Sequence, residues 1–145
     1  MATQQPAPTE NTDQDVKHFL GYFATHPDAK IRFFASGIIL QVHPDVSYMN
    51  DTKACSTASG HYFLSNNIKS GKPIFLNGAI HTLCKITGVT ASADEAELGI
   101  LFLNEQETVK LCIALQEIGH TQPPTTIHTD NTTATGIIQK TIKQQ

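Results

Sequence analysis

Three acidic side chains stand at points of the sequence where a folded chain could bring them together. Asp45 follows a strongly apolar run, Glu97 falls in the first turns of an expected long helix, and Asp130 ends a short β-branched segment. Ligand groups in open α/β sheets gather outside the strand ends, so Asp45 and Asp130 should converge if their strands are neighbours. Carboxylate oxygens suit Mg²⁺ or Mn²⁺, and two such ions can clamp the attacking water and the leaving oxygen in phosphodiester cleavage.

Glu97 is the most informative of the three because of its place on the expected helix. It lies beside Leu98 and one helical turn before Leu101, which predicts that its side chain points toward the buried side. A carboxylate in that position is costly unless it is paired or bound to a cation. The simpler interpretation is that Glu97 is one more acid of the first turn, where it stabilises the helix dipole.

The other candidates also have simpler interpretations. An aspartate after a strand is usually a cap or turn residue, which would explain Asp45 and Asp130 taken singly. None of the seven histidines forms the i, i+4 pair of a helical zinc site. His43 and His128 lie beside the proposed carboxylates in the sequence, but ordinary strand-edge histidines are the favoured interpretation.

The composition is that of one globular domain. The chain has 145 residues, 39% hydrophobic and 16% charged, which is enough for a single core. A net charge of −3 gives no bulk electrostatic footprint for nucleic acid, so binding a polyanion would need a local patch or metal ions. Cys55, Cys84 and Cys112 form no CxxC pair, which favours a reducing compartment. The sequence shows no signal peptide and no membrane-spanning run, so a cytoplasmic or nuclear location is expected.

The first thirty residues are expected to stand apart from the domain. Residues 1–12 are rich in Gln, Pro and Thr and are predicted to be a disordered tail. Residues 13–30 are predicted to be a helix and connecting segment, in which the helix begins at Asp13 as its cap. The helix should end before Pro27, because a residue that precedes proline avoids the helical region. The domain itself is expected to span residues 31–145.

The first part of the domain has the composition of β-strands. Residues 31–42 are dense in β-forming side chains, and the nearly continuous apolar run at 38–42 suits a central strand. Pro44 removes a ladder donor, so regular pairing should stop or bulge there. Residues 50–60 are polar and are predicted to be a loop.

A hairpin is expected after this loop. Strands are predicted at 61–65 and 73–76, joined by a turn within 66–71, and they should pair antiparallel. The segment 80–89 either extends the second of these strands or leads irregularly to the long helix.

The long helix is predicted over residues 93–118. Its apolar residues keep a spacing of about 3.6, Ser92 and Glu95 form a capping box, and Gly119 is the expected stop. A strand at 125–130 should follow, and then a helix that begins at Asn131 or Thr132, with Asn131 as a candidate cap, and continues to Ile142. This order indicates an α/β domain with a mixed sheet, in which antiparallel hairpin strands and a parallel strand are packed by helices.

Several motifs resemble the ribonuclease H (RNase H) region of a copia-type retrotransposon polyprotein. They are Pro44-Asp45-Val46-Ser47-Tyr48, Ser59-Gly60-His61-Tyr62-Phe63-Leu64, Ala91-Ser92-Ala93-Asp94-Glu95-Ala96-Glu97-Leu98 and Ile127-His128-Thr129-Asp130-Asn131-Thr132-Thr133-Ala134. Residues 22–33 are similar to the segment that joins the reverse transcriptase to that domain. The resemblance therefore covers most of the chain after about residue 16.

The resemblance implies an RNase H-like fold and a metal-dependent nuclease reaction. Such domains cut the RNA strand of an RNA–DNA hybrid with metal held by acidic residues, so the implied cofactor is Mg²⁺ or Mn²⁺. By position, Asp45 matches the first-strand aspartate, Glu97 the helix glutamate and Asp130 the aspartate that ends the fourth strand. Glu97 is preferred to Glu95 because it precedes an apolar run, as the glutamate of the family does.

The chain also departs from the family. The fourth acidic residue of the family lies beyond the helix that follows Asp130, and no candidate for it is present before Gln145, so the domain is expected to lack its C-terminal part. A proline precedes Asp45 where the family has none. The loop after the first strand keeps only Lys53 of the basic residues that are usual there.

Three hypotheses follow for the function. The first is a retroelement-derived endonuclease that cleaves RNA in RNA–DNA hybrids with Mg²⁺, its activity left open by the missing segment. The second is a non-catalytic remnant that binds nucleic acid or a protein partner. The third is a generic α/β domain whose acids are only caps. The sequence gives no indication of the oligomeric state.

Overall fold

The first of two units in this chain is built around one helix. The computed structural model describes residues 7–49, 52–67 and 73–139, and the chain divides into residues 1–32 and 33–145. The first unit contains helix α1 (Glu10–Thr25), which ends just before His26-Pro27, as predicted.

Helix α1 begins three residues earlier than predicted because Thr9 caps it. The Thr12 amide donates to the Thr9 hydroxyl at 3.3 Å, and the Thr9 amide donates to the Thr12 hydroxyl at 3.0 Å. The helix therefore starts within the segment expected to be a disordered tail, of which residues 1–6 lie outside the description. Asp13 is not the cap, and its carboxylate pairs with Lys17 one turn later at 2.6 Å.

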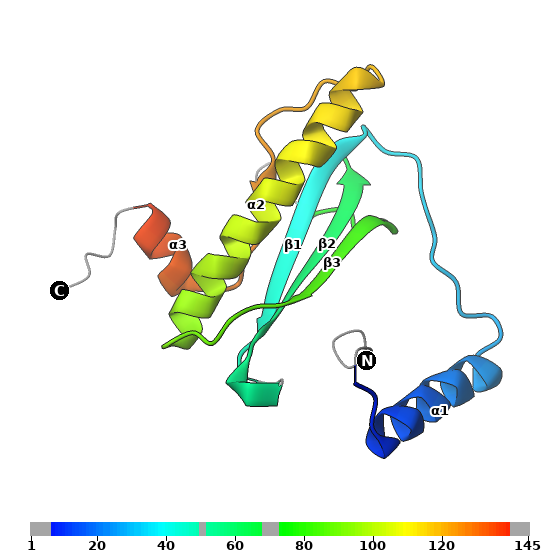
Figure 1. The fold of residues 1–145 in the computed structure, drawn as a ribbon. Helices are drawn as coiled ribbons and strands as arrows, with labels where there is room; N and C mark the ends of the chain where they lie inside the picture. The colour runs from blue at the N-terminus through cyan, green and yellow to red at the C-terminus, as the bar shows by residue number, and fades with distance from the viewer. Residues whose placement is uncertain (1–6, 50–51, 68–72, 140–145) are drawn as a thin grey trace. The chain divides into compact units, whose positions relative to one another are not determined.

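Four strands form one mixed sheet in the second unit, in the spatial order β3-β2-β1-β4. Figure 1 shows β1, β2 and β3 side by side. The strands are β1 (Ile39–Ser47), β2 (Thr57–Ser65), β3 (Ala79–Ile86) and β4 (Thr126–Ile127). β1 pairs antiparallel with β2, β2 pairs antiparallel with β3, and β4 pairs parallel with β1. The predicted α/β class, with antiparallel strands and one parallel strand, is confirmed.

Strand β1 is central, as predicted, but it runs through the proline that was expected to stop it. Pro44 stays in register with Gly60 of β2, so the predicted break is wrong. The Val42 carbonyl accepts from the His128 amide on the β4 side at 2.9 Å. Backbone groups of alternate residues point to the same side of a strand, so the Pro44 nitrogen also faces that side. The pairing with β4 ends before Pro44, so no strand lies opposite Pro44 on that side and its missing N–H group leaves no hydrogen bond unmade.

Strand β2 begins four residues earlier than predicted. Residues 57–60 are small and polar and have the composition of a loop, but the longer β1 offers them a partner as far as Ser47. Ala58 is fully buried in this extension. The rest of the described loop contains the short 3₁₀ helix η2 (Thr52–Ala54).

Strand β3 takes up the segment that the sequence left open, at 80–89. Residues 73–76 lie outside any strand, so the strand predicted there is wrong. The Phe75 carbonyl accepts from the Ser65 hydroxyl at 2.7 Å. In a strand, this carbonyl would instead accept from a backbone amide of the neighbouring strand. The turn expected at 66–71 falls mostly outside the described residues.

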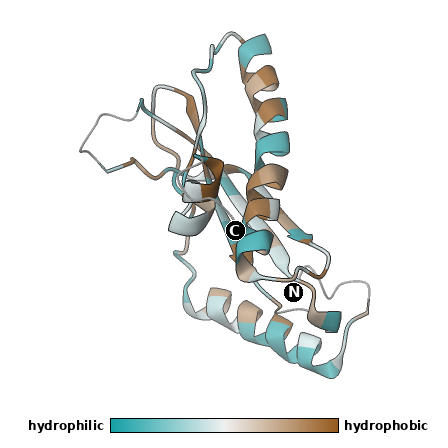
Figure 2. Ribbon diagram, turned by 90° about the vertical axis from the view of Figure 1, so that its left-hand side faces the viewer, coloured by the Kyte–Doolittle hydropathy of each residue, from teal (hydrophilic) through white to brown (hydrophobic). Residues whose placement is uncertain are grey.

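The core of this unit lies between the sheet and helix α2 (Ala93–Glu117). Its buried centre is formed by Leu40 and Val42 from β1, Tyr62 from β2 and Leu115 from α2. Apolar and polar segments alternate along α2 in Figure 2. Its apolar residues are not confined to the packed side, because Phe102, Val109 and Ile113 are exposed. Side chains alternate along a strand, so the even-numbered residues of β1 face α2 and the odd-numbered ones face away.

Local capping residues set the starts of the last two helices, but the predicted capping box is only half formed, because the Glu95 carboxylate accepts from the Ala91 amide and not from that of Ser92. The Glu95 amide donates to the Ser92 hydroxyl at 3.1 Å, and Gly119 follows α2 with a φ of 96°. Helix α3 (Thr132–Ile138) begins after Asn131, whose side chain accepts from an amide of the first turn at 2.8 Å. The helix ends at Ile138 with Gln139 as its C-cap, so the prediction that it continues to Ile142 is wrong. None of the described helices is long and apolar enough to cross a membrane.

Candidate functional site

A pocket of about 530 Å³ is lined by residues of β1, β2 and β3 and by the segment that follows β4. Its lining includes the carboxylates of Asp45 and Asp130. It also includes three imidazoles and two hydroxyl-bearing residues, which are His43, His61, His128, Ser59 and Thr82. Both aspartates are exposed. The pocket therefore offers two accessible carboxylates beside a group of aromatic nitrogen bases.

The parallel pairing of β4 with β1 brings the two aspartates together. Val42 packs under α2, so the next odd-numbered side chains of β1, those of His43 and Asp45, point to the opposite face. The His128 amide extends the parallel pairing by one bond, and Asp130 follows two residues later. The structure thus places Asp45 and Asp130 in one pocket, although they are 85 residues apart in the sequence.

Glu97 lies near the start of α2 and is half-buried. Burial raises the pKa of its carboxyl above the ordinary value, and the negative charges of Asp130, Asp45 and Asp94 raise it further. Glu97 is not among the described residues that line the pocket. The three predicted carboxylates therefore interact electrostatically, but only two of them share the pocket wall.

Other acids at the start of α2 have the capping role considered for Glu97. The Glu95 carboxylate accepts from the Ala91 amide at 2.6 Å, and Asp94 lies beside it in the first turn. Both are exposed, as surface groups that stabilise a helix dipole usually are. Glu97 differs from them in its partial burial and in its coupling to the pocket aspartates.

The donor types of this region fit a hard divalent cation. Carboxylates of Asp45, Asp130 and Glu97 are oxygen ligands of the kind that Mg²⁺ and Mn²⁺ take. Within residues 7–49, 52–67 and 73–139, however, no three His, Cys, Asp or Glu side chains are already grouped as metal ligands would be. The chemistry of the donors fits Mg²⁺, and the side-chain arrangement is not that of a closed metal site.

Neutral imidazoles line the side of the pocket next to the aspartates. The rings of His43 and His128 stack with centroids 4.9 Å apart, and the His128 Nε2 lies 2.9 Å from Gln41 Oε1. Burial lowers the pKa of both histidines, with a further lowering of the His43 pKa by His61 and of the His128 pKa by His43. The sequence placed these two histidines beside the carboxylates but did not indicate that they contact each other.

Two residues next to the site were missed at the level of sequence. The Ser59 hydroxyl donates to the Asp45 carbonyl at 2.9 Å, and Asn104 of α2 donates to the Ser59 carbonyl at 3.2 Å. Asn104 could have been found, because it is a polar residue on the buried stripe of the helix, seven residues after Glu97. Ser59 could not, since the pairing of β2 with β1 gives it its role.

Comparisons with known proteins do not place the chain in a family. No family model, curated protein or solved structure matches it. The class is therefore defined by the fold and the pocket: an α/β domain with a mixed four-stranded sheet, two carboxylates in one pocket and a third on the packed helix.

Proposed function

We propose that residues 33–139 belong to an RNase H-like domain that derives from a copia-type retroelement and cleaves RNA in RNA–DNA hybrids with Mg²⁺. The positions of the acids support this proposal. Asp45 lies in the first strand, Glu97 in the helix that follows the antiparallel strands, and Asp130 just after the fourth strand. These are the elements on which the family resemblance puts its metal-binding acids.

One observation carries the proposal: Asp45 and Asp130 line the same pocket although they are 85 residues apart in the sequence, and their charges add to the effect of burial in raising the pKa of Glu97. Like charges that are held near one another oppose folding unless a cation or a proton offsets them. A chain that needed these acids only as caps would gain nothing from the coupling. The proposed function explains it, because a bound cation turns the mutual repulsion into shared ligation.

The residues in and near the pocket suggest which role each would have in binding the cation and in cleavage. Asp45 and Asp130 would hold the cation with Glu97, and the cation would supply an activated water and charge neutralisation at the phosphate. Glu97 would have to be ionised, and its raised pKa means that it gives up its proton less readily until a cation is near. Neutral His43 and His128 add no positive charge that would compete with a cation.

The direct test is cleavage of a hybrid duplex with a labelled RNA strand, with and without Mg²⁺. We expect cleavage in the presence of Mg²⁺, and we expect chelation to stop it. Asp130→Asn and Asp45→Asn should each abolish cleavage, because each removes a negatively charged ligand. Glu105→Gln is the matched control, since Glu105 is an exposed acid on α2 outside the pocket.

Two results would contradict this proposal. Cleavage that survives Asp130→Asn or chelation would exclude these acids as the site. Binding of the hybrid without cleavage at any Mg²⁺ concentration would favour the alternative, a non-catalytic remnant that retains nucleic-acid binding.

A further inference from the structure

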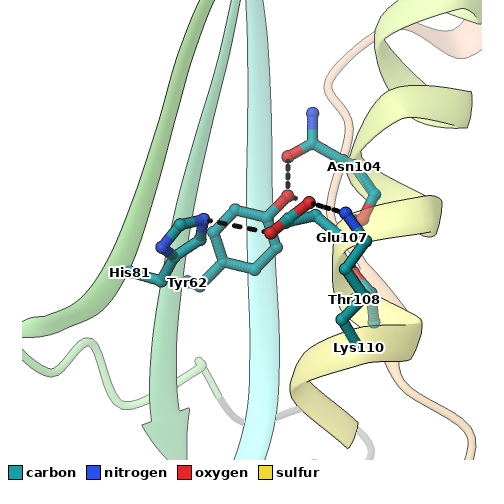
Figure 3. Close-up of polar contacts among 6 residues, drawn as sticks. All are labelled: Tyr62, His81, Asn104, Glu107, Thr108 and Lys110. Atoms are coloured by element: carbon teal, nitrogen blue, oxygen red, sulfur yellow. Dashed lines mark hydrogen bonds and ion pairs between the residues drawn. The ribbon is translucent and has the colours of Figure 1, made fainter.

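The buried carboxamide of Asn104 joins helix α2 to strand β2 through the Tyr62 hydroxyl (Figure 3). The Asn104 side chain is 0% exposed and uses both its donor and its acceptor. Its Nδ2 donates to the Ser59 carbonyl at 3.2 Å and to the Ile100 carbonyl at 2.9 Å. Its Oδ1 accepts from the Tyr62 hydroxyl at 2.6 Å. Two of these bonds cross from the helix to the sheet.

The contact between helix and strand is as close as the residues allow. Gly60 lies between Ser59 and Tyr62, and a Cβ on Gly60 would run into Asn104 Oδ1 and lie 2.9 Å from the Tyr62 ring. The missing side chain at this position lets the Asn104 carboxamide reach the backbone of β2. The hydrogen bonds of Asn104 with Ser59 and Tyr62, which we call the junction, therefore set the distance between α2 and β2.

The junction continues to the first acid of the pocket. Ser59 lies opposite Asp45 in the β1–β2 register, and its hydroxyl donates to the Asp45 carbonyl at 2.9 Å. Asn104 is seven residues after Glu97, two turns along the same helix face. A continuous set of hydrogen bonds thus links the helix that holds Glu97 to the strand that holds Asp45.

The Tyr62 hydroxyl keeps its proton at physiological pH and therefore remains a hydrogen-bond donor. Burial, with a further contribution from the negative charge of Glu107, raises its pKa to about 12. Glu107 itself is paired with Lys110 at 2.8 Å, and its other oxygen lies 3.7 Å from His81 (Figure 3). The Tyr62–Asn104 bond is therefore insensitive to pH in the range where a nuclease would act.

We propose that Asn104 is a positioning residue that sets the place of Glu97 relative to Asp45. This inference rests on the proposed function, because it assigns Asn104 a purpose in that site. An apolar side chain could fill the same volume, but only a carboxamide donates to the Ser59 carbonyl while it accepts from Tyr62. Residues that orient ligands in this way affect metal affinity without touching the metal.

The test compares the wild type with Asn104→Leu and with the double variant Asn104→Leu/Tyr62→Phe. The single variant leaves the buried Tyr62 hydroxyl with only the Asn104 backbone carbonyl at 3.4 Å in place of the carboxamide acceptor at 2.6 Å, and it is expected to unfold at a lower temperature. The double variant removes both partners, so its melting temperature should return toward that of the wild type. Neither variant can donate to the Ser59 carbonyl, so the double variant separates positioning from stability.

Two readouts are needed. The first is the Mg²⁺ concentration that gives half-maximal hybrid cleavage, which we expect to rise roughly tenfold in the double variant. The second needs no activity: the backbone amide NMR signals of Asp45 and Glu97 should shift in the double variant. Thr108→Val is the control, because the Thr108 hydroxyl donates to the Asn104 carbonyl within α2 at 2.6 Å and does not cross to the sheet. It should change neither readout.

The outcomes separate the two proposals. A double variant with wild-type Mg²⁺ dependence and unchanged Asp45 and Glu97 amide signals overturns the role of Asn104 and leaves the proposed function standing. A wild type that neither cleaves the hybrid nor responds to Mg²⁺ overturns the proposed function. In that case the amide signals alone decide whether Asn104 positions the helix against the strand.

Discussion

The imidazole rings of His43 and His128 stack with centroids 4.9 Å apart, at an angle of 25°, on the pocket side of the sheet. His43 comes from β1 and His128 follows β4, so the parallel strand pair brings them together. The His43 Nε2 is buried and has no hydrogen-bond partner among the described residues. A proton there would be poorly solvated, and both rings are therefore held in the neutral form near pH 7.

The first prediction concerns the pH dependence of stability. In the unfolded chain both histidines take up a proton near the ordinary pKa of 6.5, whereas in the folded chain their pKa is lower. Between these values the unfolded state binds more protons, so the free energy of unfolding should fall as the pH is lowered from about 7 to about 5. Urea denaturation at a series of pH values measures this slope.

The variant His43→Gln should flatten that slope, because one of the two titrating groups is gone. His120→Gln is the control, since His120 is exposed and lies after α2. An unchanged slope in His43→Gln would show that the stacked pair is not the source of the pH dependence.

The second prediction is that Glu97→Gln stabilises the protein at neutral pH. The substitution removes a half-buried charge that is repelled by Asp130, Asp45 and Asp94. Because the site is partly solvated, the gain should be small, about 0.5 kcal/mol. Chemical denaturation at low salt measures it, and added salt should reduce the difference.

The same variant tests the cation hypothesis by a second route. A ligand that binds only the folded state raises the unfolding temperature. Mg²⁺ should therefore raise the melting temperature of the wild type more than that of Glu97→Gln. Equal responses of the two proteins would argue against Glu97 as a ligand.

The third prediction is that Gly60→Ala destabilises the fold. Its methyl group would overlap the Asn104 carboxamide, and overpacking of this kind costs about 1–3 kcal/mol. The cost should shrink in an Asn104→Ala background, because the obstructing group is then absent. A double-mutant cycle of unfolding free energies gives the coupling, and strictly additive values would contradict the contact.

The fourth prediction is that Ser92→Ala weakens the start of α2. The Ser92 hydroxyl accepts from the Glu95 amide at 3.1 Å, and loss of such a cap costs about 1 kcal/mol. Thermal unfolding measures the loss. Ser47→Ala, at an exposed position at the end of β1, should leave the melting temperature nearly unchanged. An equal effect of the two substitutions would mean that the cap contributes nothing.

The elements with local signals could be predicted from the sequence. Ser92, Gly119 and Asn131 are capping residues whose hydrogen bonds reach only three or four residues along the chain, and they mark the helix ends correctly. Strand limits were less well predicted, because pairing depends on a partner that is distant in the sequence. The extension of β2 to Thr57 and the passage of β1 through Pro44 both follow from the neighbouring strands.

The candidate site, too, has some features that the sequence predicts and others that depend on contacts between distant residues. The sequence by itself indicated which residues are candidates for chemistry, because Asp45, Glu97 and Asp130 lie near the ends of strands and a helix that the sequence predicts. Only the tertiary structure decided that Asp45 and Asp130 share a pocket and that Glu97 is coupled to both without lining it. The physical reason is that residue type and spacing can be read from the sequence alone. The distance between a helix and a strand depends instead on contacts between residues far apart in the sequence, such as that of Asn104 with Ser59.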